Sequence, residues 1–328
     1  MKALITAMGL AFSAGAVMAD TPILTVYTYD SFVTDWGPGP QVEAAFEATC
    51  ACDLHLVGVG DGAAVLARLR LEGVRSDADV VVGLDTNLTH AAAATGLFTN
   101  HGVNVEGLTL PIPWQDDVFL PFDWGYFAFV HRTDLALVPH DFITLGQSNV
   151  RILIQDPRSS TPGLGLLMWV EAAYGDRAGE IWQDLVDNIV TVTPGWSESY
   201  TLFLEGEADM VLSYTTSPAY HRIAEGDDGF AAAPFAEGHY TQIEVMGILD
   251  HSDQPDLAQQ FVAFMLSQTA QAILPTTNWM YPAALPRAAL PDGFDTFPRP
   301  NTTLLFSPEQ AANLRNDALS TWQAAFGP

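Results

Sequence analysis

ILTVYTY at residues 23–29, DLHLV at 53–57 and DVVVGL at 79–84 are three short segments rich in apolar and β-branched residues, as is typical of strands. Each is followed by a segment with helical spacing, at residues 41–49, 63–72 and 87–97. Strands that alternate with helices form a parallel sheet with right-handed crossovers. This stretch therefore predicts an α/β fold for the first part of the chain.

The rest of the chain predicts a second α/β unit. Strand-like residues 119–130 are interrupted by Pro121 and Gly125, and a clear amphipathic helix is expected at 256–273. The other expected strands lie at 151–155, 190–193, 209–214 and 242–249, and the other helices at 163–174, 180–190, 197–206 and near the C-terminus. Two α/β lobes with mid-chain strands passing between them predict a hinged clamshell, with a ligand bound beyond the carboxyl ends of the strands.

The N-terminus is typical of a signal peptide, which we expect to span residues 1–19. Lys2 precedes an apolar run, and Val17-Met18-Ala19 fits a cleavage site before Asp20. The chain carries 12 basic and 39 acidic residues, a formal net charge of −27. Such a surface repels nucleic acid and anionic lipid. It indicates either solubility alone or a mild attraction for a cationic ligand.

Cys50 and Cys52 are the only cysteines. In an oxidising compartment two thiols this close are expected to form a local disulfide without a catalytic role. The alternative, a reduced pair that binds metal, is weaker because structural zinc takes four ligands and this pair supplies two.

Aromatic residues stand next to Gly, Pro, Ser or Asn at predicted strand ends and turns, rather than within apolar runs. They are Tyr29, Trp196, Tyr214, Tyr220 and Trp279. Rings placed in this way hold a flat heteroaromatic cation by stacking and cation–π attraction, each about 0.5–2 kcal/mol. The alternative is ordinary core packing.

The segment QDPRSSTPGLG at 155–165 predicts an anion site at a helix N-terminus. Thr161 is a natural N-cap and Pro162 suits the first helical position. Ser160, Thr161 and the Gly163 amide would then face a phosphate with hydroxyl and N–H donors. The alternative is a capped helix without a ligand.

The segment from Gly58 to Ala63 follows a strand and opens a helix, so it superficially matches a dinucleotide-binding fingerprint. That interpretation is rejected, because the fingerprint belongs in the first βα turn and Asp61 would face the pyrophosphate. Asp61 is instead a candidate partner for a positive charge or a donor group of the ligand, the alternative being a solvated loop carboxylate.

Nine segments together resemble the periplasmic thiamine-binding proteins of bacterial importers, in order and spacing, from about Ile23 to Phe306. They are VYTYDSF (26–32), DWGPGP (35–40), DADVVVGLD (77–85), PFDWGYFAFV (121–130), QDPRSSTPGLG (155–165), GWSESY (195–200), VLSYTTSPAYH (211–221), EGHY (237–240) and NWMYP (278–282). The resemblance implies a type II periplasmic-binding-protein fold and the binding of thiamine and its mono- and diphosphate. It also implies that the five aromatic residues surround the thiazolium and pyrimidine rings, that Ser160 contacts phosphate, and that Asp61 lies in the cleft.

On this basis we expect lobe one to comprise residues 20–121 plus 246–328 and lobe two residues 122–245. The protein is expected to be periplasmic and monomeric, to bind no cofactor or metal, and to deliver its ligand to a permease and ATPase of an ABC importer. Two other functions were weighed. Ferric-iron binding is disfavoured because Trp196 and Trp279 suit an organic cation better, and a thiaminase is disfavoured because its nucleophile must be a free thiolate, which a disulfide excludes.

Overall fold

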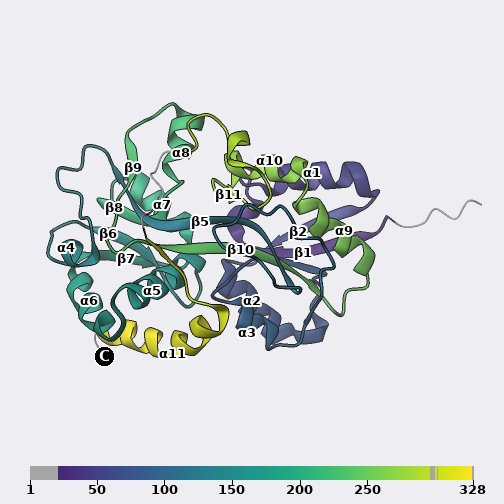
Figure 1. Ribbon diagram of the computed structural model, residues 1–328, viewed down its shortest axis with the longest axis horizontal. Helices are drawn as coiled ribbons and strands as arrows, with labels where there is room; N and C mark the ends of the chain where they lie inside the picture. The colour runs from purple at the N-terminus through teal and green to yellow at the C-terminus, as the bar shows by residue number, and fades with distance from the viewer. Residues whose placement is uncertain (1–20, 296–299, 301, 327–328) are drawn as a thin grey trace, which may run out of the picture.

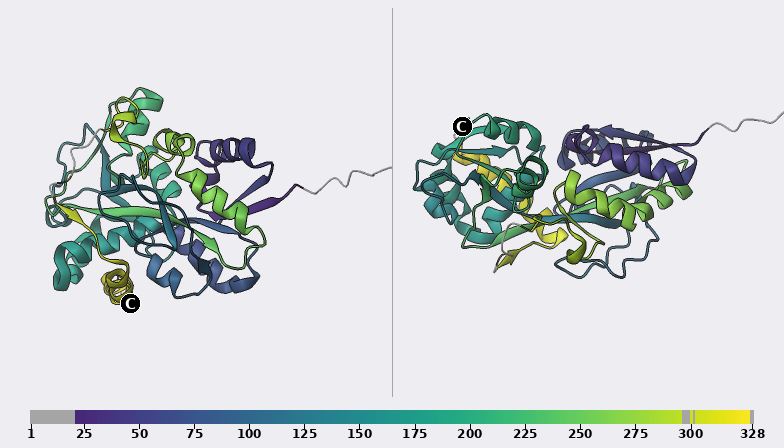
Figure 2. Two further views of the ribbon diagram at one scale, coloured as in Figure 1. Left: turned by 45° about the vertical axis from the view of Figure 1, so that its right-hand side comes forward. Right: turned by 90° about the horizontal axis from the view of Figure 1, so that it is seen from above.

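The computed structural model describes residues 21–295, 300 and 302–326, so the expected signal peptide at 1–19 lies outside the described residues. Two α/β lobes lie side by side and share two long strands (Figures 1 and 2). The strands follow the order β2-β1-β3-β10-β5-β8-β6-β7, and four short strands pair off this path. The predicted two-lobe α/β clamshell is confirmed.

Lobe one is built on the parallel strands that open the chain. β1 pairs in parallel with β2 on one side and β3 on the other. Its elements are β1 (Ile23–Thr28), η1 (Asp30–Val33), α1 (Gly39–Cys50), β2 (Asp53–Gly58), α2 (Gly62–Glu72), η2 (Gly73–Arg75), β3 (Val80–Asp85), α3 (Thr89–Ala93), β4 (Phe98–Thr99), α9 (Pro255–Met265), α10 (Gln268–Thr277) and β11 (Tyr281–Pro282). Helices α1, α9 and α10 cover one face of this sheet, and α2 and α3 lie on the other (Figure 1).

Lobe two repeats the layered arrangement around β6 and its parallel neighbours β7 and β8. Its elements are α4 (Phe142–Gly146), β6 (Ile152–Gln155), α5 (Thr161–Tyr174), η3 (Gly175–Arg177), α6 (Ala178–Leu185), η4 (Val186–Asn188), β7 (Ile189–Thr193), α7 (Trp196–Leu204), β8 (Met210–Tyr214), α8 (Pro218–Tyr220), η5 (His221–Glu225) and β9 (Phe230–Ala232). The segment η6 (Arg287–Ala289), the short strand β12 (Thr303–Leu304) and α11 (Pro308–Ala325) complete the chain. Most predicted elements are present, although the helix expected at 87–97 is limited to α3.

Two antiparallel strands, β5 (Phe119–Arg132) and β10 (His239–Leu249), run through both lobes. The break expected in β5 at Pro121 and Gly125 was wrong. The pairing of β5 with β10 shifts register next to Pro121. Proline has no backbone N–H to donate, and a strand tolerates this at a register shift. Gly125 leaves room for Met280, whose Sδ would lie 3.1 Å from an added Cβ.

The single helix expected at 256–273 is two helices, α9 and α10. α9 ends at Met265 with Leu266 as its C-cap, and Ser267 caps the second helix, because its side chain accepts a hydrogen bond from the Ala270 amide. α10 also continues through Pro275 to Thr277.

The predicted lobe boundaries at 121/122 and 245/246 fall inside β5 and β10, and they stay a prediction. The prediction groups residues 246–328 with lobe one, whereas α11 packs against α5 and α6 of lobe two and against α3 (Figure 1). The C-terminal helix thus lies across the base of both lobes.

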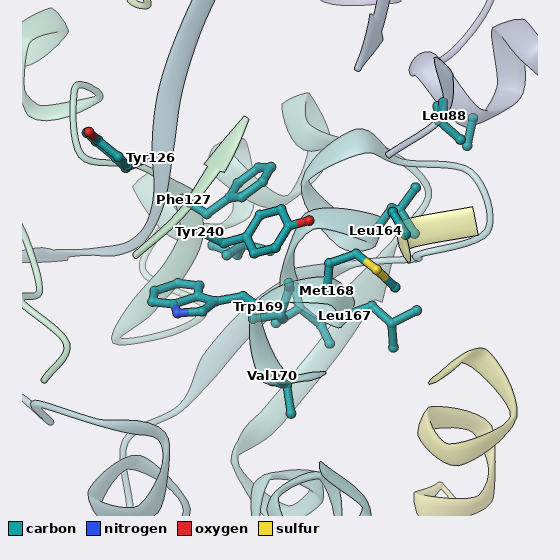
Figure 3. Close-up of a cluster of buried hydrophobic side chains, with 14 of the residues drawn as sticks. Leu88, Tyr126, Phe127, Leu164, Leu167, Met168, Trp169, Val170 and Tyr240 are labelled. Carbon is teal, nitrogen blue, oxygen red and sulfur yellow. The ribbon is translucent and has the colours of Figure 1, made fainter. Parts of the chain in front are cut away.

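The largest buried apolar cluster extends from α2 and α3 through the shared strands into α5 and α6. Figure 3 shows its central part, where Phe127 of β5 lies next to Tyr240 of β10, and Leu164, Leu167 and Trp169 of α5 belong to the same cluster. Cys50 and Cys52 are joined in a disulfide before β2, as expected. None of the helices within the described residues has both the length and the apolar character needed to cross a membrane.

Candidate functional site

A cavity of about 480 Å³ lies between the lobes, a size typical of small-molecule sites. It adjoins the carboxyl ends of β1 and β8, where α/β sheets bind ligands, and β10 contributes Glu244. Seven of the nine predicted site residues line it: Tyr29, Asp61, Thr161, Trp196, Tyr214, Tyr220 and Trp279. Among the described residues of its lining, the charged side chains are Asp61 and Glu244.

The aromatic walls come from both lobes. All five predicted aromatic residues line the cavity, and two further rings, Trp36 and Tyr200, join them. Tyr200 stacks on Trp196 with ring centroids 5.0 Å apart, and Trp36 lies 6.3 Å from Trp196 on the other lobe. Trp36, in the segment DWGPGP (35–40), is 53% exposed and lines the cavity.

Hydrogen bonds hold these rings in place. Tyr29 Oη shares its one hydrogen between Asn278 Oδ1 at 3.0 Å and Glu244 Oε2 at 3.2 Å. Three more bonds fix the other rings: Tyr214 Oη to Gln242 Oε1 at 2.8 Å, Tyr220 Oη to Glu225 Oε1 at 2.9 Å, and Trp196 Nε1 to Ser213 Oγ at 2.8 Å. Rings held before a ligand arrives need less ordering when it binds.

Trp279 is held in a backbone conformation that a bulky residue rarely adopts, with φ of 57°. It stands just beyond α10, where its amide donates to the carbonyl of Leu274 at 3.0 Å. Glycine is the usual residue at such a helix end. Strain of this kind gathers at functional sites, and here it presents the indole to the cavity.

A pair of buried carboxyl groups, Asp123 and Glu244, lies where Glu244 forms part of the cavity lining, which we call the cavity floor. The two residues are cross-strand partners on β5 and β10. Burial raises the pKa of Asp123 to about 7, and burial together with the neighbouring Asp123 raises that of Glu244 well above its usual range. The side chain of Glu244 therefore keeps its proton beside the carboxyl group of Asp123.

Sequence reasoning missed this carboxyl pair. Each carboxyl residue stands in the middle of an apolar central strand, in PFDWGY (121–126) and in QIEVMG (242–247). An acidic residue at such a position is buried without a paired base, which is the signal that could have identified it. Asn278 was missed as well; its Nδ2 donates to Asp123 Oδ2 at 2.6 Å.

Asp61 lies where the sequence suggested, in the cavity wall immediately before α2, but its partners are different from those expected. Ser160 Oγ donates to Asp61 Oδ2 at 2.7 Å, and the backbone N–H of Trp196 also donates to this carboxylate. Both donors belong to lobe two. Burial raises the pKa of Asp61 to about 6, against the opposing effect of these bonds.

The N-terminus of α5 differs in detail from the prediction. Ser160, not Thr161, is the N-cap residue, and Thr161 begins the helix. The physical reason is that Thr161 Oγ1 accepts the Gly62 amide of lobe one at 3.1 Å, so this hydroxyl is used between the lobes. Ser160 is buried beside Asp61, and Gly163 lies outside the lining, against the backbone of Gln155 and Asp156.

Comparisons with protein families, named proteins and solved structures agree in the kind of protein that they find. Residues 41–277 match the family model described as bacterial extracellular solute-binding protein. The thiamine-binding periplasmic protein of Escherichia coli is 54% identical over 307 residues, which cover 93% of each chain. A solved periplasmic thiamin binding protein is 51% identical, with a TM-score of 0.91 over 98% of this chain and all of that one. An iron-bound protein from Pseudomonas aeruginosa shares the fold at 20% identity, with a TM-score of 0.70 over 93% of this chain and 99% of that chain.

Proposed function

We propose that this chain, which belongs to the bacterial extracellular solute-binding proteins, captures thiamine in the cavity between its lobes. One observation carries the proposal: seven aromatic rings surround a cavity whose charged lining residues, among those described, are both acidic. A flat organic cation gains stacking and cation–π attraction from such rings and charge attraction from the floor. Thiamine, a cation with two aromatic rings, has this chemistry.

The ligand range, the location and the partners follow from the same proposal. Thiamine monophosphate and diphosphate are included as ligands, with the predicted phosphate contacts at Ser160, Thr161 and Gly163. The chain is secreted to the periplasm through its signal peptide and acts as a monomer that passes the ligand unchanged to a permease and ATPase of an ABC importer. The names of two similar proteins, a thiamine-binding periplasmic protein and a periplasmic thiamin binding protein, support this assignment.

The two other functions have less support in the site. An iron site needs converging oxygen ligands, but the hydroxyls of Tyr214 and Tyr220 are bonded to separate partners, Gln242 and Glu225. A thiaminase needs a cleft thiolate, but Cys50 and Cys52 are joined to each other before the amino end of β2, outside the cavity lining.

The proposal is tested by calorimetric titration of the mature protein with thiamine. We expect saturable, submicromolar binding without turnover on long incubation. Trp279→Ala and Tyr220→Ala should each weaken binding by about 1–3 kcal/mol, because each removes an aromatic ring that lines the cavity.

Phe326→Ala serves as the control, since it removes an exposed ring outside the cavity. Wild-type protein that gives no heat with any thiamine form contradicts the proposed function. Unchanged isotherms for both wall variants contradict the aromatic-wall model alone.

A further inference from the structure

Glu225 lies behind the cavity wall and receives hydrogen bonds from two side chains. Tyr220 Oη donates to its Oε1 at 2.9 Å, and His221 Nδ1 lies 2.6 Å from its Oε2. A carboxylate only accepts hydrogen bonds, so Nδ1 is the donor. The other ring nitrogen of His221, Nε2, lies 2.9 Å from the hydroxyl of Tyr200. Glu225 and His221, which we call the dyad, thus join two rings of the cavity lining without belonging to that lining themselves.

A π-helical turn brings these side chains together. In η5 (His221–Glu225) the Gly226 amide donates to the carbonyl of His221, five residues earlier. An α-helix places residues four apart on one face, and the wider π turn lets Glu225 also face Tyr220, five residues before it. Turns of this kind are rare, and they occur frequently at functional sites. The backbone thus favours a role for Glu225 in the adjacent cavity.

The rings that the dyad holds take part in two aromatic contacts between the lobes. Tyr220 meets Trp279 of lobe one, with ring centroids 5.4 Å apart. Tyr200 stacks on Trp196 at 5.0 Å, and Trp196 in turn lies 6.3 Å from Trp36 of lobe one. The dyad therefore supports, from the side of lobe two, both places where aromatic walls of the two lobes meet.

The dyad is a rigid support at one end and accessible at the other. His221 is 1% exposed, and its ring stacks on Phe230 with centroids 3.6 Å apart. An imidazole bonded at both nitrogens and packed on its face has little freedom to move, so the hydroxyl of Tyr200 is fixed as well. The side chain of Glu225 is 43% exposed, so it can be shortened without leaving a cavity in the core.

We propose that Glu225 and His221 are positioning residues of the ligand site, which hold Tyr220 and Tyr200 in place from outside the cavity. This inference rests on the proposed function, in which these rings form walls around thiamine. Rings that are ordered before the ligand arrives lose less freedom when it binds. Loss of Glu225 releases both rings, and it should weaken binding although every group of the cavity lining is still present.

The test is calorimetric titration with thiamine in two backgrounds, wild type and the double variant Tyr200→Phe/Tyr220→Phe. In the wild type, Glu225→Ala should weaken binding about fivefold or more, because the ligand must then order two side chains. The double variant keeps both rings and cannot bond to the dyad. In that background Glu225→Ala should therefore change the affinity by less than about twofold.

Two further variants sharpen the titration. Glu225→Gln keeps one of the two acceptor oxygens, so its loss of affinity should be smaller than that of Glu225→Ala. Glu207→Ala is the same truncation at an exposed loop residue of lobe two outside the cavity lining, and it should bind as the wild type does. Unchanged affinity in Glu225→Ala, or a loss of equal size in both backgrounds, overturns the inference.

Circular dichroism of the ligand-free proteins tests the support of the rings without thiamine. Glu225→Ala should change the near-ultraviolet spectrum, because freed rings lose their fixed surroundings, and should leave the far-ultraviolet spectrum as it is. Glu207→Ala should change neither. An unchanged near-ultraviolet spectrum in Glu225→Ala also overturns the inference. Wild-type protein that does not bind thiamine refutes the proposed function, and this spectrum then still decides whether the dyad holds the rings.

Discussion

At the scale of single residues, the carboxyl pair at the cavity floor is the feature with the largest electrostatic cost. Asp123 and Glu244 are almost fully buried, and their hydrogen-bond partners are the neutral groups of Asn278, Gln242 and Tyr29. A buried carboxylate without a cation is unfavourable, so the pair holds a proton when the cavity is empty. A cationic ligand supplies the missing positive charge, and this gives the pair a role in binding.

We expect Glu244→Gln to weaken thiamine binding by about 1–3 kcal/mol, because an amide keeps the shape of the side chain but cannot give up a proton and become negatively charged when the cation binds. Calorimetric titration at pH 7.5 measures the effect. Glu180→Gln, the same chemical change at an exposed position on α6, is the control and should bind as the wild type does. Equal affinity of Glu244→Gln and wild type would show that the charge at the floor is not used.

At the scale of elements, helix α5 connects the core to the cavity. Gly165 of α5 lies so close to Phe127 of β5 that an added Cβ would fall 2.0 Å from the ring. Phe127 in turn stacks on Tyr214, a cavity wall, with ring centroids 5.2 Å apart. The position of α5, whose N-terminus carries Ser160 and Thr161, thus depends on a glycine that permits close packing.

Gly165→Ala should lower the free energy of unfolding by about 1–3 kcal/mol, since the methyl group overpacks the core between α5 and β5. Denaturant unfolding followed by circular dichroism measures this change. Gly179→Ala in α6 is the matched control, because its Cβ would lie 3.4 Å from Thr321 in ordinary contact and alanine favours a helix. A Gly165→Ala protein as stable as Gly179→Ala would contradict the packing described here.

At the scale of the whole molecule, burial of acidic groups sets how stability depends on pH. The pKa values of Asp61 and Asp85 are raised to about 6 and that of Asp123 to about 7, in each case chiefly by burial. A folded-state pKa above the unfolded value means that the folded protein binds more protons, so stability is lost as the pH rises through about 6 to 7. His239 acts in the opposite direction, because burial lowers its pKa to about 4. Its contribution to the stability of the fold is therefore lost as the pH falls below the unfolded-state pKa of about 6.5.

The melting temperature of the ligand-free protein should therefore rise by about 3 °C or more when the pH is lowered from 8 to 6. Differential scanning fluorimetry in buffers of equal ionic strength measures the change. Asp123→Asn, which removes one of the titrating groups, should show a smaller rise. A melting temperature that is flat or falls over this range would contradict the assigned direction of these pKa shifts.

The sequence alone determined much of the fold because the relevant signals are local. Alternating strands and helices from Ile23 onward predicted the α/β lobe, and the helices beginning near Gly62 and Thr161 were placed within two residues. The five aromatic residues were found for the same reason, since each stands beside a turn residue at the end of an element. The resemblance to a known family then supplied the expected ligand.

The tertiary structure decided what depends on residues far apart in the chain. Glu244 meets Asp123 only because β5 and β10 pair in one register, and Asp61 meets Ser160 only because the two lobes close on each other. The continuity of β5 through Pro121 likewise depends on a register shift against its partner strand. The burial of a carboxyl group, which sets its charge state, depends on the whole folded molecule. A local pattern of residues therefore does not predict it.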